Sequence, residues 1–270
     1  MPNSSEFCRG GPLLARCVVL WLDLLGYERT TREAHDKGES QQEFIKIYRS
    51  LENVRKEIES VWYPGKDKKY ESFADQINSP FRLKAFSDNI FMGWPIGDTA
   101  GKSTLSRALR TASIFQLDMA MDGIFCRGAI TIGDAYIDEI TVFGMALITA
   151  VEAEKHCAHD PRIILCDSAV KVTEQVHMEP SLARYIRTDT DNRCFVNYLE
   201  VMMSSEHELA PTDEQLCKHR DAVSNKLKEF HKIPKILSKY QWVARYHNSF
   251  CDKHSKQFSE LCKIPDHPVN

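Results

Sequence analysis

The chain lacks any apolar run long enough to cross a membrane. Its longest run, 17–27, is interrupted by Asp23 and covers only about half of the ~20 residues that a membrane-spanning helix needs. The first fifteen residues contain Glu6 and Arg9 and no continuous apolar stretch leading to a cleavage site, so a secretion signal is not expected. We therefore expect a cytoplasmic protein with no membrane partner.

An excess of positive charge and a cysteine framework are also missing. The 35 basic and 38 acidic residues give a net charge of -3, which provides no overall basic field and argues against a nucleic-acid partner. The nine cysteines are scattered and include no C-x-x-C pair, so we expect reduced thiols in the core. Two groups of His and Cys, at 156–160 and 247–254, are more simply interpreted as packing residues than as metal ligands.

The apolar pattern alternates between strand and helix periods. A continuous apolar run at 17–22 predicts a buried strand, spacings of three and four predict a helix at 44–61, and two short apolar runs around Ser87-Asp88-Asn89 predict a hairpin. Further elements follow in the order helix 105–115, strand 124–133, helix 144–157, strand 162–166, strand 195–199 and helices from 213 onward. This alternation predicts an α/β (α+β) sandwich, a mixed sheet with packed helices, over 15–203, and a helical C-terminal extension over 204–270.

Two acidic residues stand at places where strands end. Asp23 closes the first strand, and Asp88 lies at the tip of the predicted hairpin. If these strands are neighbours, the two carboxylates meet at one end of the sheet and offer the hard oxygen ligands that Mg²⁺ or Mn²⁺ prefers. Two such ions can clamp a triphosphate and activate an attacking hydroxyl. Backbone N–H groups at Leu25, Gly26 and Tyr27 are candidate donors to phosphate oxygens.

Each acid also has a simpler interpretation. Asp in a Ser-Asp-Asn turn is usually only a turn former. Asp23 lies within an apolar run, where an unpaired carboxylate is expensive to bury, so it needs a partner of some kind.

The order of these segments resembles the class III adenylate and guanylate cyclase family over about residues 15–175. The family motif F-x-D-I-x-G-F has its counterpart in 21–27, the hairpin G-D in Ser87-Asp88, and R-x-G-I-H-x-G in 127–133. The resemblance implies a class III nucleotidyl cyclase-like fold that uses two ions, Mn²⁺ or Mg²⁺. It places Asp23, the carbonyl of Leu24 and Asp88 as metal ligands, with Asp23 and Asp88 as the catalytic acids, and Arg127 beside the substrate.

Several family positions are changed in this chain. Lys84 occupies the place of the base-selecting lysine, but its acidic partner is replaced by Thr141. Ile148 and Glu152 stand where the family has the Asn and Arg that stabilise the transition state. Either another cation, such as Arg127 or Lys155, supports the triphosphate, or the domain is an inactive relative that binds or dimerises.

The variant motifs are most similar to the pyrimidine cyclases of bacterial Pycsar antiphage systems, on the glycine-opened helix at 143–147 and the Glu-rich stretch at 151–154. That resemblance implies a homodimer with active sites at its interface, which converts UTP or CTP, UTP being slightly favoured, to a 3′,5′-cyclic nucleotide. The product would act on a downstream effector in antiphage defence.

One further segment invites a different function. Residues 97–104 approach a P-loop, but they have three residues between the glycines where that motif has four, which removes an N–H group from the phosphate cradle. An unrelated NTPase using Lys102 remains the third hypothesis, behind an active cyclase and an inactive cyclase-fold protein.

Overall fold

A mixed sheet forms the centre of the computed structural model, which describes residues 13–62, 82–96, 102–138, 140–175, 183–203 and 212–265. The strands run in the order β2-β3-β1-β4-β6-β8-β7, and β5 pairs with β4. β4 and β6 are parallel, and the other described pairs are antiparallel. The strands are β1 Ala15–Leu24, β2 Arg82–Phe86, β3 Asn89–Pro95, β4 Cys126–Ile137, β5 Val142–Phe143, β6 Ile163–Leu165, β7 Ile186–Thr188 and β8 Cys194–Val196.

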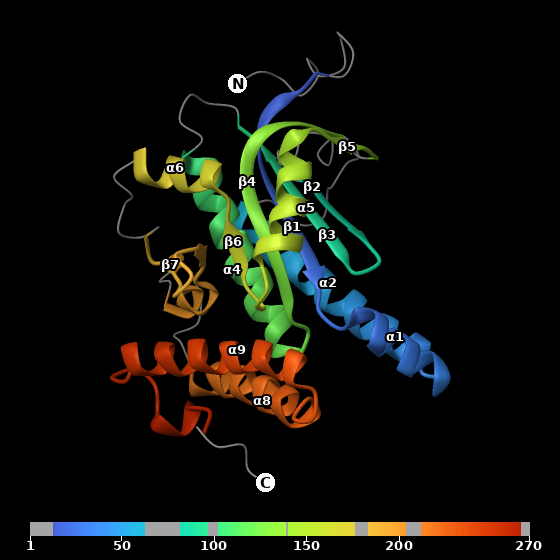
Figure 1. Ribbon diagram of the computed structural model, residues 1–270, viewed down its shortest axis with the longest axis vertical. Coiled ribbons are helices and arrows are strands. Elements are labelled where there is room, and N and C mark those ends of the chain that lie inside the picture. The colour runs from blue at the N-terminus through green and yellow to red at the C-terminus, as the bar shows by residue number, and fades with distance from the viewer. Residues whose placement is uncertain are drawn as a thin grey trace.

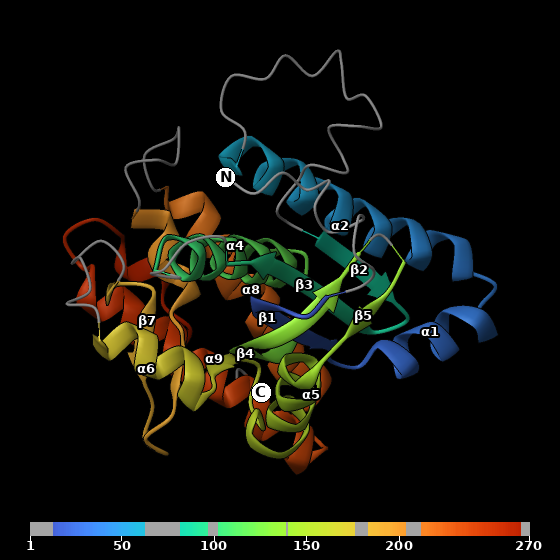
Figure 2. The same cartoon turned by 90° about the horizontal axis from the view of Figure 1, so that it is seen from above.

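Helices cover both faces of this sheet, which confirms the predicted mixed α/β fold (Figures 1 and 2). Figure 2 shows α4, with α2 outside it, on one face and α5 on the other. The helices are α1 Tyr27–Asp36, α2 Ser40–Trp62, α4 Lys102–Met121, α5 Met145–Cys157, α6 Asp167–Gln175, α8 Asp213–Glu229 and α9 Pro234–Lys253, with 3₁₀ turns η2 Tyr198–Met203 and η3 Glu260–Cys262.

Strand β1 runs through the middle of the sheet and is buried on both faces. Its even-numbered side chains, such as Leu20 and Leu22, join the large core beneath α4. Its odd-numbered side chains, such as Val19, join a smaller core beneath α5. Successive strand residues point to opposite faces, so an almost continuous apolar run is what a strand covered on both sides requires.

The hairpin β2–β3 brings the second acid beside β1. Asp23 lies opposite Asn89 in the antiparallel register of β1 and β3, and the Leu24 N–H donates to the carbonyl of Asp88 over 2.8 Å. Ser87 has a φ of 59°, a left-handed conformation that glycine adopts without strain. Ser87 therefore holds, with some strain, a turn that a glycine would form without strain.

The C-terminal helices α8 and α9 lie across the lower ends of the sheet and of α4 in Figure 1. Val223 and Tyr246 from these helices belong to the same buried apolar cluster as Leu22 of β1. The helical character expected from 213 onward is confirmed. The boundary at 203/204 stays a prediction, because 204–211 lie outside the described residues.

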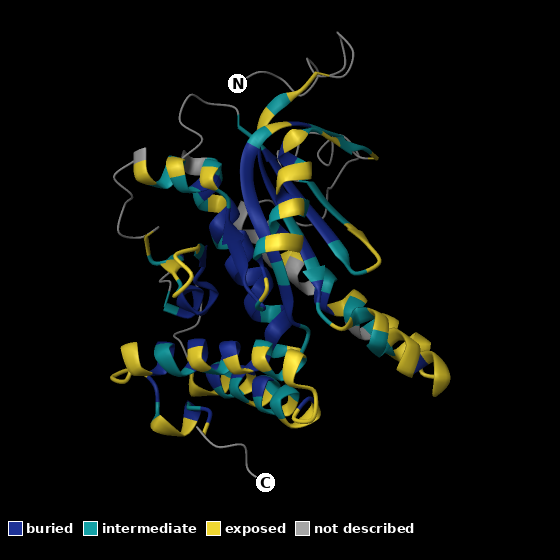
Figure 3. Ribbon diagram, viewed as in Figure 1, coloured by how far each residue is buried: buried dark blue, intermediate teal, exposed yellow. Residues whose placement is uncertain are grey.

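Two short elements differ from the sequence prediction. The predicted strand at 195–199 is wrong in its second half: β8 ends at Val196, and the chain turns at Tyr198 into η2, whose Leu199 N–H donates to the hydroxyl of Tyr246. Helix α1 was not predicted, because it is almost entirely exposed or half-buried (Figure 3) and buries only Ala34, so no apolar stripe marks it. Within the described ranges, no helix is long and apolar enough to span a membrane.

Candidate functional site

The site is built where β1 ends and β4 begins. Asp23 and Arg127 face each other across these antiparallel strands, and Nε of Arg127 donates to Oδ2 of Asp23 over 2.9 Å. Glu154 reaches the same guanidinium from α5, with Oε1 2.7 Å from Nε. Arg127 is therefore an ion-pair partner of two carboxylates that come from different layers of the fold.

Burial dominates the electrostatics of these two acids. It raises the pKa of Asp23 above its ordinary value, against the opposing effect of Arg127, and the negative charge of Asp88 raises it further. Burial also raises the pKa of Glu154, again opposed by Arg127. Oε1 of Glu154 is buried and accepts no hydrogen bond from the described residues, so this carboxylate depends on Arg127 for its compensation.

Asp88 is placed beside Asp23 as the sequence suggested. Asp23 is the last residue but one of β1, Asp88 directly precedes the neighbouring strand β3, and their charges interact. The Asp88 side chain accepts a hydrogen bond of 2.9 Å from the amide of Asn89, and among the described residues no cation lies within 4 Å of it. A half-buried carboxylate without a cation, next to a second carboxylate, is a donor set that fits a divalent metal ion.

The loop after β1 fits the phosphate prediction only in part. The expectation of a free N–H at Leu25 is wrong, because this group donates to the carbonyl of Phe125 over 2.8 Å. Gly26 adopts a φ of 80° and precedes α1, which begins at Tyr27. The first-turn N–H groups of a helix have no partner inside the helix, so the positions from Tyr27 onward offer donors that Leu25 does not.

Lys84 lies on β2 with a buried ammonium nitrogen that has no hydrogen-bond partner among the described residues. Burial lowers its pKa, and the charge of Asp138 opposes this effect. Asp138 accepts hydrogen bonds from the N–H groups of Thr141 (2.6 Å) and Ile140 (2.8 Å) and from the hydroxyl of Tyr136 (2.8 Å). These contacts, the Thr141 bond first, hold the pKa of Asp138 below its ordinary value.

Asp138 therefore supplies an acid near Lys84 that the residue at Thr141 cannot supply. The sequence signal was present, since Asp138 opens the short turn between β4 and β5, but nothing in the spacing pointed to Lys84. Glu154 was missed for a similar reason: on a helix rich in Glu, the sequence does not distinguish the one acid that faces Arg127. A third missed residue, Lys239 of α9, also interacts electrostatically with Asp23 and Arg127.

The positions that the resemblance assigns to transition-state stabilisation carry exposed side chains. Ile148 and Glu152 are both exposed on α5, and Lys155 is exposed as well. Among the described residues, no group of three His, Cys, Asp or Glu side chains could hold a metal ion. The P-loop-like residues 97–101 lie outside the described ranges, and α4 begins at Lys102.

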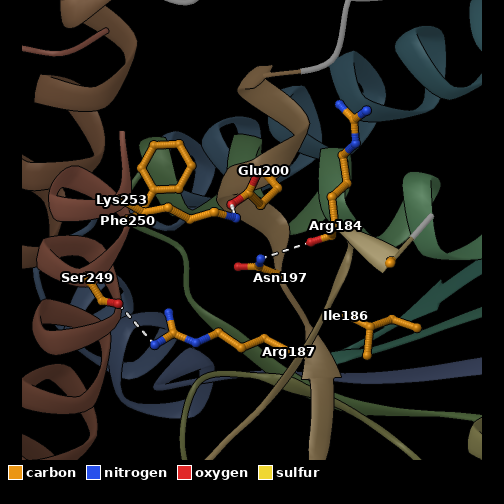
Figure 4. A pocket seen from close by; sticks show the side chains of 9 residues that line it. Arg184, Ile186, Arg187, Asn197, Glu200, Ser249, Phe250 and Lys253 are labelled. Carbon is orange, nitrogen blue, oxygen red and sulfur yellow. Dashed lines mark hydrogen bonds and ion pairs between the residues drawn. The ribbon is translucent and has the colours of Figure 1, made fainter. Parts of the chain in front are cut away.

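A cavity of about 270 Å³ lies elsewhere, between β7, η2 and α9 (Figure 4). Several of its polar side chains form ion pairs or hydrogen bonds with one another. Lys253 pairs with Glu200, and Arg187 donates to the hydroxyl of Ser249 over 3.0 Å. None of the predicted site residues lines this cavity. This cavity is therefore separate from the residues that the sequence singled out.

Comparison with known proteins finds no matching family model and no matching curated protein. Among solved structures, similarity is found to a class III adenylyl cyclase-like ATP-binding protein from Pseudomonas aeruginosa, at 12% identity and a TM-score of 0.45 over 70% of this chain. The match spans only 40% of that protein. The guanylyl cyclase Cya2 matches at 14% identity and a TM-score of 0.41, over 75% of this chain and 100% of that one. An adenylate/guanylate cyclase/hydrolase from Silicibacter pomeroyi matches at 18% identity and a TM-score of 0.37. This match covers 68% of this chain and 95% of that one. Similarity of this degree supports no conclusion about activity.

Proposed function

We propose that this chain is a metal-dependent nucleotidyl cyclase. One observation supports the proposal: Asp23 of β1 and Asp88 of the β2–β3 turn come from distant parts of the sequence to the same end of the sheet, where the Leu24 N–H donates to the carbonyl of Asp88 and the charge of Asp88 acts on Asp23. Two adjacent carboxylates that are not both satisfied by the protein's own cations favour a site for divalent metal. The motif order around them supports cyclase chemistry over other uses of such a metal.

In this proposal the reaction is an internal displacement. The 3′-oxygen of the nucleoside triphosphate attacks the α-phosphorus, the bond to the β-phosphate oxygen breaks, and pyrophosphate leaves. Asp23, the carbonyl of Leu24 and Asp88 would hold Mg²⁺ or Mn²⁺. When bound, such ions lower the pKa of the attacking hydroxyl and neutralise the charge of the triphosphate.

Arg127 gives the site two states. In this structure its guanidinium neutralises Asp23, which competes with a metal for the same oxygen. Glu154 lies close enough to take over the guanidinium when Asp23 is used as a ligand, since its Oε1 is already 2.7 Å from Nε. The Asp23–Arg127–Glu154 cluster can thus release the Asp23 carboxylate without leaving a buried cation unpaired.

The substrate and the biological role extend the proposal. Pyrimidine triphosphates, UTP before CTP, follow from the resemblance of the variant motifs. Lys84 and Asp138, whose charges interact, are residues suited to bind the edge of a base. A cytoplasmic homodimer with active sites at the interface, and a cyclic nucleotide that acts on a defence effector, follow from the same resemblance.

A second candidate function is a cyclase-fold protein that binds or dimerises without catalysis. The observation in its favour is that Arg127 already pairs with Asp23, while Ile148 and Glu152 cannot stabilise a transition state. The active and inactive hypotheses differ in whether the purified protein turns over a triphosphate.

The role of the acids is tested by Asp88→Asn. We expect this variant to lose at least 100-fold in cyclic nucleotide formation with Mn²⁺, because the amide cannot neutralise a divalent cation, while the melting temperature stays within a few degrees. Asp36→Asn, at the exposed end of α1, is the matched control and should retain full activity. An Asp88→Asn variant as active as the control would refute the metal assignment.

A further inference from the structure

Helix α9 reaches the candidate site from the C-terminal part of the chain. The ring of Tyr240 packs edge-on against Phe125, with centroids 5.2 Å apart. Phe125 directly precedes β4, and its carbonyl accepts the N–H of Leu25 at the end of β1. The first half of α9 therefore lies against the end of the sheet at which Asp23 and Arg127 meet (Figure 1).

Lys239 precedes Tyr240 on this helix and is half-buried. It interacts electrostatically with Asp23, Arg127 and Asp160, and its charge also acts on Glu154. Among the described residues, no carboxylate lies within 4 Å of its ammonium nitrogen, in contrast to the lysines that pair on the surface nearby, such as Lys226. Burial, followed by the charge of Arg127, lowers the pKa of Lys239.

A half-buried ammonium group without a direct partner is expensive unless an anion completes its surroundings. Two of the acids whose charges interact with Lys239 already have a partner: Asp23 and Glu154 both form ion pairs with Arg127. If Asp23 binds a metal and Arg127 turns to Glu154, the remaining uncompensated cation of the cluster is Lys239. This arrangement leaves one positive charge without a direct partner, and a negatively charged ligand would compensate it.

We propose that Lys239 contacts the triphosphate of the substrate and stabilises the charge that develops as pyrophosphate leaves, in place of the Asn and Arg that this chain lacks at Ile148 and Glu152. This inference rests on the proposed cyclase function. It assigns the C-terminal helices a direct part in the site, and it favours Lys239 over Arg127, which is paired, and over Lys155, which is exposed.

The experiment compares Lys239→Met and Lys239→Arg with Lys256→Met, a control that removes the same charge at an exposed position beyond α9. Cyclisation of each nucleoside triphosphate with Mn²⁺ gives kcat and KM. Calorimetry with a non-cyclisable 3′-deoxynucleoside triphosphate, and with the matching nucleoside, gives binding without turnover. Circular dichroism and melting curves report the fold of every variant.

We expect Lys239→Met to reduce kcat by about 100-fold and to weaken binding of the triphosphate about tenfold, while nucleoside binding and the fold stay unchanged. Lys239→Arg should recover part of both, and Lys256→Met should equal the wild type. A wild type that makes cyclic nucleotide, together with a Lys239→Met variant of equal kcat, overturns the role of Lys239 and leaves the cyclase proposal standing.

The two proposals fail in different ways. If the wild type forms no cyclic nucleotide but binds the triphosphate, and Lys239→Met weakens that binding, the contact with the triphosphate stands and the cyclase activity does not. If the wild type does not bind a triphosphate at all, the assignment of Lys239 is overturned together with the proposed function.

Discussion

At the scale of single residues, Gly128 shows how closely β1 and β4 approach beside the site. A Cβ atom at this position would lie 2.3 Å from the carbonyl oxygen of Trp21, which is far inside contact distance and belongs to backbone. Gly133, further along the same strand, is less restricted: its nearest neighbour would be the Cβ of Ala146, at 3.4 Å. Gly128 is therefore required by a close backbone contact, whereas Gly133 leaves room for a methyl group.

Replacing each glycine by alanine tests whether the added methyl group costs stability at Gly128 and not at Gly133. We expect Gly128→Ala to lower the free energy of unfolding by about 1–3 kcal/mol, because the strands must separate to admit the methyl group. Gly133→Ala should change stability by less than about 1 kcal/mol. Urea denaturation of both variants measures the difference, and equal stability of the two would contradict the close contact at Gly128.

The charged residues of the candidate site differ in how far the sequence could reveal their places. Asp23 and Asp88 were predictable, because an acid inside an apolar strand and an acid at a hairpin tip are local signals. Glu154, Asp138 and Lys239 were not, because each acts on a partner from another element, and the periodicity of a helix or the chemistry of a turn does not name that partner. Tertiary packing decides those pairs.

At the scale of elements, a buried chain of hydrogen bonds joins α8 and α9. Tyr198 and His219 are 2.8 Å apart, His219 and His247 are 2.9 Å apart through their Nδ1 atoms, and His247 Nε2 lies 2.8 Å from the carbonyl of Cys262. Because the carbonyl only accepts, His247 donates from Nε2 and accepts at Nδ1. His219 then donates from Nδ1 and accepts the Tyr198 hydroxyl. Both imidazoles are neutral in this series of hydrogen bonds.

These buried histidines predict that the folded state loses stability in acid. Burial lowers the pKa of His247 from 6.5 to about 4, and burial and the neighbouring ring lower that of His219 as well. Below pH 6.5 the unfolded state therefore binds more protons than the folded state, and stability falls as the pH drops toward 4. Through His247 alone, the free energy of unfolding should fall by about 2 kcal/mol between pH 7.5 and pH 5.

Denaturation at the two pH values tests this expectation. His247→Gln should be less stable at pH 7.5 but should lose less on acidification than the wild type does. His231→Gln, at an exposed position after α8, is the control and should show the wild-type pH dependence. A His247→Gln variant with the full acid-induced loss would show that protonation elsewhere controls stability.

The elements themselves were predictable wherever one face is strongly apolar. β1, α2, the β2–β3 hairpin, α4 and α5 all follow from apolar spacing, with ends that differ by a few residues. Helix α1 could not be found in this way, because ion pairs such as Arg32 with Glu28 support it at its surface in place of core contacts. The two-residue β5 and three-residue β7 are too short for any period to mark them.

At the scale of the whole molecule, exposed apolar side chains lie around β5 and the start of α5, at the end of β4 opposite to Asp23 and Arg127. We define the β5–α5 patch by four side chains that are between 48% and 90% exposed: Ile140, Phe143, Met145 and Ile148. Contiguous exposed apolar residues of this kind mark interaction surfaces in soluble proteins. The proposed homodimer gives this patch an occupant, a second copy of the chain.

Phe143→Asp tests this assignment. We expect the variant to be monomeric by light scattering and at least tenfold less active, because a carboxylate cannot be buried in an apolar interface without a partner. Leu261→Asp, at an apolar side chain in η3 that is also exposed, is the control and should remain dimeric. A wild type that is monomeric at every concentration, or a dimeric Phe143→Asp variant, would contradict the interface.

The central claim is that the carboxylates of Asp23 in β1 and Asp88 before β3 support the formation of a cyclic nucleotide. The most direct test is to incubate the purified chain with each of the four nucleoside triphosphates and Mn²⁺ and to identify the products by mass spectrometry. We predict a 3′,5′-cyclic pyrimidine nucleotide and pyrophosphate in equal amounts. Intact triphosphates after prolonged incubation, or free phosphate without a cyclic product, would contradict the claim.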